Sequence, residues 1–359
     1  KRHRSSIILH LLPISFIFIV WSVVALSPGL CAAADERGNP FVVYAVDGSG
    51  EQLLHITVRP NGNQVQVLQE GVLAMPGKPR GIAKHPTQPS IIVTLLGKGA
   101  ESPRAVTIGN NGDGKLSIVG VSELQDSTGY TSLDRTGGYF LTSSYHDGHF
   151  DVYRVKPNGV VGDRVSHQQV AEKYAHSVLT TPDNRFVYVP CVKEFNAIYQ
   201  YAFDGQTGSV LPLEPFDAKP PHMFGPRHIA YHPDLPYVYF SNEQQLGVSA
   251  YRIEKDGQLA ALQHATTIPR RGPYTAGVRG MHASDIAMTH DGKFLFLALR
   301  DFVGDEDSVF AFRVAEDGRL SLVSRKRVGN IPWCLRVSLS DSYLRVSETG
   351  DEAVAVLPI

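Results

Sequence analysis

One short phrase recurs along most of the chain: an apolar strand pattern ends in a turn, and a second apolar strand follows it. The turn positions are Pro86, Thr136, Pro182, Pro233, His290 and Ser340, which lie 50, 46, 51, 57 and 50 residues apart. A repeat of this length is typical of β-propellers, in which each blade is a small four-stranded sheet. The period therefore points to a repeat architecture built from short strands.

Hairpin signals alternate with this phrase. They are Asn61-Gly62, Asp113-Gly114, Asn158-Gly159, Asp256-Gly257 and Asp317-Gly318, with Thr207-Gly208 as a weaker version. Asn-Gly and Asp-Gly favour two-residue type I′ turns, because both central residues of such a turn have positive φ. Beyond the N-terminal segment no stretch keeps a helical period over three turns, so we expect antiparallel strands.

The six phrases, together with the strand pattern Phe41–Tyr44, predict an all-β domain over residues 35–359, a seven-bladed β-propeller. Two stacked β-sandwiches are the rival fold, but a sandwich has no reason to keep one period along the chain. The N-terminal blade begins at its second strand, and the sequence stops after Val354–Ile359, one outer and one closing strand short. We therefore expect the blade that joins the termini to be incomplete.

The N-terminal 34 residues have the pattern of an export signal. Lys1, Arg2 and Arg4 form a basic region, Ile7–Leu26 is mostly apolar, and the small residues of Cys31–Ala34 offer a cleavage site. A retained membrane anchor is the alternative, because the apolar stretch is nearly long enough to span. We expect cleavage, no membrane span afterwards, and a periplasmic or secreted protein.

Charge and cysteine content exclude several other classes. The formal net charge is −1 and the pI is about 7.0, so no basic field favours nucleic acid. After signal cleavage only Cys191 and Cys334 remain, and the repeat places them in different blades, so we expect free thiols. No G-x-S-x-G, H-E-x-x-H or P-loop motif is present. We expect a monomer that works without a metal or other cofactor.

Polar residues gather where the inner strands are expected to begin. Some lie at or beside the expected start of an inner strand, and others lie at the end of the strand that follows it. They are Tyr145, His176, Arg227, His228, Asn242, Glu243, Asp285 and Arg300. A propeller binds its ligand where these strand ends meet around the central channel. The sequence therefore predicts a functional site there.

The segment Gly225–His228, continued by His232–Asp234 and Asn242-Glu243, resembles the signature of the seven-bladed lactonase family. That family includes propeller-type 6-phosphogluconolactonases and fungal carboxymuconate cyclases. The resemblance runs over residues 41–359 and is most specific over 175–320. It implies catalytic roles for His176, Arg227, Glu243 and Arg300. We expect Tyr145, His228, Asn242 and Asp285 to contact the substrate.

These residue types suit the opening of a lactone. The reaction needs an activated water and stabilisation of an oxyanion. Glu243 or His176 could be the base, and Arg227 or Arg300 could hold the oxyanion or a carboxylate. A lactone-forming cycloisomerase would need the same groups, so residue types do not separate the two directions. The third hypothesis is a non-catalytic propeller that binds a ligand or a protein partner.

One departure from the family concerns the last blade, where many relatives have Pro-Arg and this chain has Pro332-Trp333-Cys334. Loss of a cationic contact there puts a phosphorylated substrate in doubt. Export does so too, since 6-phosphogluconolactone is a cytoplasmic metabolite. An unphosphorylated sugar lactone, or another cyclic ester, fits better.

Several residues have structural explanations as well. We expect His85, His232 and His290 to serve turns or packing, and His228 could equally bond a neighbouring blade. The alternative for Arg227 with Glu243 is an ion pair between blades. The long link from Pro269 to His282 is either a solvated insertion or a lid over the site, and it carries Arg270, Arg271 and Arg279.

Overall fold

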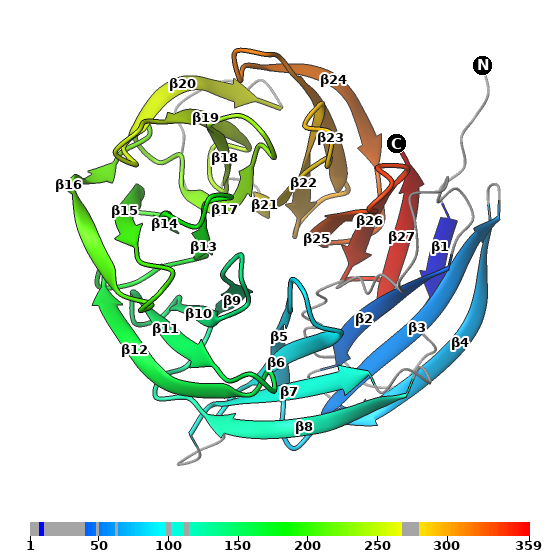
Figure 1. The fold of residues 1–359 in the computed structure, drawn as a ribbon. Coiled ribbons are helices and arrows are strands. Elements are labelled where there is room, and N and C mark those ends of the chain that lie inside the picture. The colour runs from blue at the N-terminus through cyan, green and yellow to red at the C-terminus, as the bar shows by residue number, and fades with distance from the viewer. Residues whose placement is uncertain are drawn as a thin grey trace, which may run out of the picture.

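The structure is a computed structural model that describes residues 7–10, 40–47, 50–61, 64–97, 102–110, 115–267 and 280–359. These residues form seven antiparallel sheets arranged in a ring, and they include no helix (Figure 1). The predicted seven-bladed β-propeller is therefore confirmed, and the stacked sandwiches are excluded. Among the described residues there is accordingly no helix that could cross a membrane.

The strands follow one another blade by blade. The first blades contain β2 (Phe41–Asp47), β3 (Gln52–Asn61), β4 (Gln64–Ala74), then β5 (Pro79–Lys84), β6 (Ser90–Leu95), β7 (Arg104–Asn110), β8 (Leu116–Glu123). The next two contain β9 (Tyr130–Leu133), β10 (Tyr139–Ser144), β11 (His149–Val155), β12 (Val161–Gln169), then β13 (Leu179–Thr180), β14 (Phe186–Cys191), β15 (Ala197–Phe203), β16 (Val210–Ala218). The last three contain β17 (Pro226–Tyr231), β18 (Tyr237–Asn242), β19 (Gly247–Ile253), β20 (Leu259–Thr266), then β21 (Met281–Met288), β22 (Phe294–Asp301), β23 (Ser308–Val314), β24 (Leu320–Arg327), then β25 (Pro332–Val337), β26 (Tyr343–Glu348), β27 (Ala353–Pro358).

The strands β5, β9, β13, β17, β21 and β25 lie nearest the centre of the ring (Figure 1). Each blade packs against the next through apolar side chains. In one such layer, Tyr139 and Phe150 of the third blade share a buried cluster with Val187 and Tyr201 of the fourth. Because the apolar layers lie between blades, the inner strand ends are left to polar residues.

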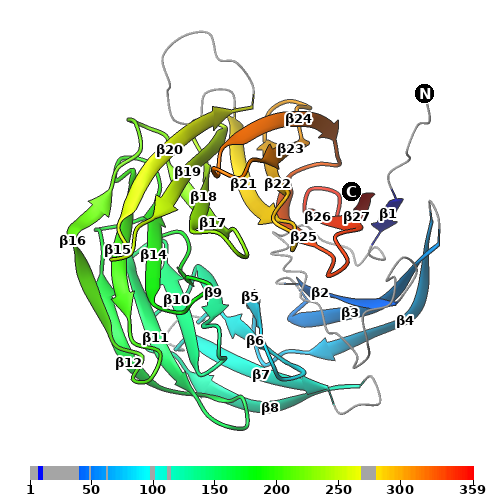
Figure 2. The same cartoon turned by 45° about the horizontal axis from the view of Figure 1, so that its top comes forward.

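The blades at the two ends of the sequence differ from the others. Within the described residues, the sheet β2-β3-β4 has three strands, as expected for a blade that begins at its second strand. The last blade is completed by β1 (Ile7–His10), which pairs antiparallel with β27, as Figure 2 also shows. This strand lies within the expected export signal 1–34, whose other residues lie outside the described ones. Cleavage of the segment stays a prediction.

The hairpins differ from the predicted type I′ turns. Gly159, Gly208, Gly257 and Gly318 have φ between 78° and 88°, but the residues before them do not have positive φ. Around Gly159, its N–H donates to the carbonyl oxygen of Lys156 at 2.8 Å. This is a type I turn followed by a left-handed glycine, which needs only one positive φ. The type I′ prediction is wrong for these four hairpins, and the turns at Gly62 and Asp113-Gly114 lie outside the described residues.

Three histidines lie at the turns that follow inner strands. Nδ1 of His85 and of His232 each accepts two backbone N–H groups of its own turn, at 3.0 to 3.3 Å. His290 is exposed, and its Nδ1 lies 2.8 Å from Oδ1 of Asp341 in the next blade. The predicted turn and packing roles of these histidines are confirmed.

The two cysteines of the propeller lie in different blades, on β14 and β25. Cys191 and Cys334 are both buried and unpaired, so the free-thiol prediction is confirmed. Burial raises the pKa of Cys334 to about 12, and it raises that of Cys191 as well. Both thiols stay protonated near neutral pH, which makes them poor nucleophiles.

Candidate active site

Antiparallel pairing places the start of an inner strand beside the end of the next strand along the chain. Arg227 lies at the start of β17, and Glu243 follows the end of its partner β18. In the next blade His282, near the start of β21, pairs directly with Arg300 near the end of β22. His176 precedes β13 in the neighbouring blade. Three consecutive blades therefore direct ionisable residues to one end of the ring.

The carboxylate of Glu243 is the centre of this group. Its Oε2 lies 3.1 Å from Nε of Arg227 and 3.9 Å from Nε2 of His176. Its Oε1 lies 3.5 Å from Nη2 of Arg300 and 3.4 Å from Nδ1 of His282. The structure thus brings together the four residues expected to be catalytic. We call Glu243, Arg227, Arg300, His176 and His282 the Glu243 cluster.

His282 is the member of the cluster that the sequence did not reveal. It is the last residue of the long link 269–282, where the surrounding residues gave no family motif. The available signal was its position three residues before Asp285, on the same inner strand. The rest of this link up to residue 279, with Arg270, Arg271 and Arg279, lies outside the described residues, so the choice between a lid and a solvated insertion stays a prediction.

The charges of the cluster are strongly coupled because all five groups are largely buried. Burial raises the pKa of Glu243, but its hydrogen bond with His282 and the charges of Arg300 and Arg227 outweigh this and lower it to about 2. Burial and repulsion from Arg227 lower the pKa of Arg300 to about 9. At neutral pH two guanidinium groups face one carboxylate, which leaves one positive charge uncompensated.

His176 is neutral at physiological pH. Burial is the main reason that its pKa lies well below 6.5, and the positive charge of Arg227 is the second. Its Nδ1 is buried and has no hydrogen-bond partner. A neutral imidazole with a free nitrogen is the form that can accept a proton.

His228 links three blades and is held in one tautomer. Nη1 of Arg227 lies 3.1 Å from its Nε2, and a guanidinium can only donate. Nε2 is therefore the acceptor, and Nδ1 carries the proton that it donates to Oδ1 of Asp285 at 2.7 Å. Oδ2 of Asp285 in turn accepts from Arg336 and from the backbone N–H of Leu335, both at 2.9 Å. The structure therefore shows the hydrogen bond to the neighbouring blade that was the structural alternative for His228.

His228, Asp285 and Asn242 were expected to contact the substrate, but their polar groups are hydrogen-bonded to other residues of the protein. Asn242 is fully buried, donates to Gln245 at 3.1 Å and accepts from Ser249 at 3.0 Å. These three residues support the blades around the cluster, and their contact with a substrate stays a prediction.

Tyr145 lies at the edge of the cluster, in the hairpin after β10. Its ring meets that of His176 edge to face, with centroids 5.5 Å apart. Nζ of Lys193 lies 5.5 Å from the Tyr145 ring and 4.3 Å from that of Tyr174. Lys193 therefore adds a cation at the rim that the sequence did not single out.

Trp333 occupies the position where the family pattern has an arginine. The Cζ of Arg300 lies 4.1 Å from its ring centroid, and that of Arg227 lies 5.6 Å away. The indole therefore stabilises both buried guanidinium groups through cation–π contact. It also lines a cavity of about 40 Å³ with residues from the inner strands of other blades, namely Arg80, Tyr130, His176, His228 and Asp285.

A wider cavity of about 450 Å³ lies at the opposite ends of the inner strands. Its lining is mostly apolar, with Ile229, Ile286 and Leu335 among the side chains. Arg135 reaches it, but its guanidinium is bound to the carbonyl oxygens of Thr180 and Thr181. His290 also lines this cavity, but it pairs with Asp341, and none of the lining residues is a carboxylate facing buried arginines as in the Glu243 cluster.

The protein is thus a seven-bladed propeller that holds a buried cluster of arginine, glutamate and histidine side chains at its inner strand ends. The family described as "Lactonase, 7-bladed beta-propeller" matches residues 41–359. The chain therefore belongs to the seven-bladed β-propeller lactonase family, as the resemblance implied.

Individual relatives agree with this membership. The chain is 30% identical to a 6-phosphogluconolactonase of Pectobacterium carotovorum over 207 residues, which cover 57% of this chain and 58% of that protein. It is 27% identical to a 6-phosphogluconolactonase of Yersinia pestis over 321 residues, covering 88% and 90%. The fold is similar to that of a periplasmic gluconolactonase of Pseudomonas aeruginosa, with a TM-score of 0.69, 22% identity, and 90% and 89% of the chains covered.

The neutral state of His228 predicts a loss of stability in mild acid. Burial and the charge of Arg227 lower its pKa to about 4 in the folded protein, against 6.5 for an ordinary histidine. The unfolded chain therefore takes up the proton first, so this stabilisation is complete above pH 6.5 and is lost as the pH falls towards 4. The loss amounts to about 3 kcal/mol. Urea unfolding between pH 4.5 and 7.5 should show a smaller pH slope for His228→Gln, and an unchanged slope would contradict the assignment.

Proposed function

We propose that this protein hydrolyses a lactone of a sugar acid at the Glu243 cluster, at the mouth of the central channel. The observation that carries the proposal is the pair of buried guanidinium groups facing one carboxylate, with a neutral histidine alongside. The uncompensated positive charge matches the single negative charge of the oxyanion that forms when water attacks a lactone. Membership of the lactonase family and the names of its relatives support the same reaction.

His176 is the better candidate for the base. Protonation of Glu243 would leave Arg227 and Arg300 buried without a counter-charge, which is why its pKa is so low. His176 can take a proton from the attacking water, and the resulting imidazolium would lie 3.9 Å from the Glu243 carboxylate. The same histidine can return this proton to the ring oxygen as the ester bond breaks.

In this reaction the water oxygen bonds to the carbonyl carbon, and the carbonyl oxygen becomes negatively charged. Arg227 or Arg300 holds that oxygen through charge-assisted hydrogen bonds. Arg300 suits this role because its Nε and Nη1 are buried without hydrogen-bond partners. Collapse of the intermediate cleaves the bond to the ring oxygen and releases the open hydroxy acid.

The substrate we favour is an unphosphorylated sugar lactone. Trp333 lies against Arg300 where the family pattern would supply a further cation, so the cluster has one spare positive charge rather than two. An indole face also suits the apolar C–H face of a sugar ring. Export, which the N-terminal pattern predicts, fits such a substrate. The similarly folded Pseudomonas protein is named a periplasmic gluconolactonase.

The direct test is turnover by the purified protein. Acid release from glucono-δ-lactone, followed at constant pH by titration, should exceed spontaneous hydrolysis by at least about 100-fold. The 6-phosphorylated lactone should have the lower kcat/KM, because its phosphate carries more negative charge than the one uncompensated positive charge of the Glu243 cluster can balance. Tight binding without turnover would support the non-catalytic propeller instead. Ring closure of an unsaturated acid, by addition of its carboxylate to the double bond and without hydrolysis of the lactone, would support the cycloisomerase.

A further inference from the structure

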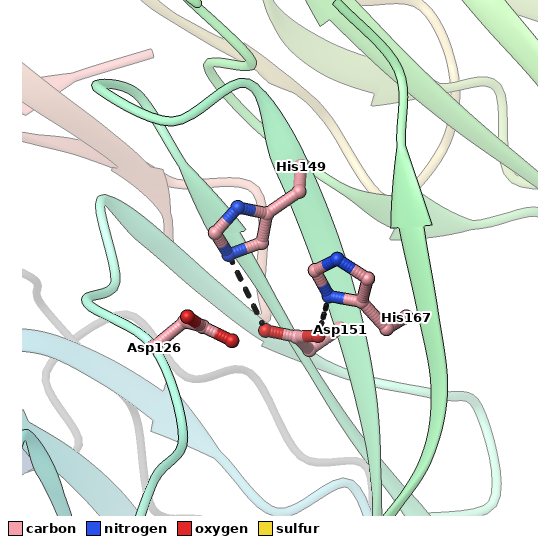
Figure 3. Close-up of side chains that lie close together, drawn as sticks. All are labelled: Asp126, His149, Asp151 and His167. Carbon is pink, nitrogen blue, oxygen red and sulfur yellow. Dashed lines mark hydrogen bonds and ion pairs between the residues drawn. The ribbon is translucent and has the colours of Figure 1, made fainter.

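A second group of ionisable side chains lies in the third blade, away from the Glu243 cluster. His149 and Asp151 lie on β11, His167 on β12, and Asp126 in the connection from β8 to β9. Asp151 and His167 are direct cross-strand partners, and His149 is two residues from Asp151, so all three side chains share one face of the sheet. Figure 3 shows the four side chains converging.

The donor atoms lie close enough together for small movements to place them around one metal ion. One donor atom from each of the four residues lies within 4.8 Å of the other three. Nε2 of His149 is 3.5 Å from Oδ2 of Asp151, and Nδ1 of His167 is 2.7 Å from Oδ1 of Asp151. Ligands about 2.1 Å from a tetrahedral metal lie about 3.4 Å from one another. For such a geometry the 2.7 Å pair would have to separate and the more distant donors approach, each by about 1 Å, and Asp126 and His167 are the half-exposed members that can move.

The burial of the group differs between its inner and outer members. The Asp151 side chain is 1% exposed, and the nearest positive partner of its buried Oδ2 is Nε2 of His149, 3.5 Å away. The side chains of Asp126 and His167 are 38% and 40% exposed, so an ion could enter from solvent. A buried carboxylate is costly unless positive groups face it, and a metal ion held with the two histidines would supply such a charge.

One positive group already lies against these ligands. Nη1 of Arg164 contacts Oδ2 of Asp126 and lies 3.1 Å from Oδ1 of Asp151. Its side chain is 23% exposed and lies on the outer strand, so it can turn outward into solvent. The guanidinium therefore marks where positive charge is favoured, and it would compete with a metal ion for that place.

We propose that Asp126, His149, Asp151 and His167 form a structural site for a divalent transition metal ion of the Zn²⁺ class. Two imidazoles and two carboxylates are a donor set that suits Zn²⁺ better than Ca²⁺ or Mg²⁺, which prefer oxygen ligands alone. The bound ion would tie the connection that leads into inner strand β9 to the two outer strands of the blade. None of these residues belongs to the Glu243 cluster, so the site is independent of the proposed lactonase activity.

The test is metal binding to the full, chelator-treated protein. Calorimetry with Zn²⁺ should give one ion per chain, and Co²⁺ should give the visible absorption of a tetrahedral site. Asp151→Asn should weaken Zn²⁺ binding by more than about 100-fold, beyond the usual cost of losing an outer-shell partner. His167→Gln, at a half-exposed position, should also weaken it without threatening the fold. Arg164→Gln should bind Zn²⁺ more tightly than the wild type, because the competing cation is gone.

His290→Gln is the matched control, since His290 also pairs with an aspartate but stands outside the group. It should bind Zn²⁺ like the wild type. Zn²⁺ should also raise the melting temperature of the wild type and leave that of Asp151→Asn unchanged. Equal Zn²⁺ binding by the wild type, Asp151→Asn and His167→Gln, or no stoichiometric binding at all, would overturn the proposal whatever the lactonase assay shows.

Discussion

Glu243→Gln should lower lactone turnover by at least about 100-fold and the free energy of unfolding by about 3–5 kcal/mol. The substitution keeps the shape of the side chain but removes the only carboxylate within the described part of the chain that pairs with Arg227 and Arg300. Both guanidinium groups would then lie buried without a counter-charge. Unfolding in urea gives the stability change, and the rate per folded molecule gives the catalytic change.

The control for this prediction is Glu254→Gln. Glu254 also pairs with an arginine, Arg252, but both side chains are exposed, so stability should change by less than about 0.5 kcal/mol. A Glu243→Gln protein that unfolds and turns over like the wild type would show that the carboxylate neither balances the arginines nor serves the reaction. Loss of stability with an unchanged rate per folded molecule would make the ion pairs purely structural and strengthen the binding-module hypothesis.

His176→Asn should lower kcat by about 10²- to 10⁴-fold, the usual contribution of a general base, while KM changes little. Asparagine can still hydrogen-bond but cannot take a proton from water. Because the pKa of His176 lies well below 6.5, the wild-type rate should stay level from pH 8 down to about 6.5 and fall only in stronger acid. The variant should lose that acid limb along with its activity.

The matched variant here is His290→Asn, at an exposed turn that also pairs with a carboxylate. Its rate per folded molecule should equal that of the wild type. If His176→Asn retained both its rate and the acid limb, another group would have to be the base. If instead both histidine variants lost activity only in proportion to lost folding, the histidines would be packing residues.

The sequence was sufficient for the features that a local pattern encodes. The period from Pro86 to Ser340 predicted seven blades, because each blade is a unit of sequence whose turns come at fixed intervals. The same register placed Arg227, Glu243 and Arg300 at strand ends, where antiparallel pairing brings them to one side of the sheets. It also separated Cys191 from Cys334, because β14 and β25 belong to blades that are not neighbours in the ring.

Only the tertiary structure decided the features that depend on contacts between blades or on loop geometry. In the hairpins at Gly159, Gly208, Gly257 and Gly318 the glycine has positive φ and the residue before it does not, whereas other hairpins place residues such as Asn184 and Leu246 at positive φ. The contacts with Arg227 and Asp285 fix the tautomer of His228. No local sequence pattern shows that the side chain of His228 will bond to Asp285 in the next blade.

Other side chains come together from segments whose separation along the sequence matches no known motif. His282 reaches Glu243 from a neighbouring blade, and Asp126 reaches Asp151 from a connection 25 residues earlier in the chain. Side-chain direction, burial and inter-blade distance bring these groups together, and none of these quantities is written in the local sequence. The sequence alone therefore determined the repeat and the ends of its strands, while packing of the blades determined which charges meet.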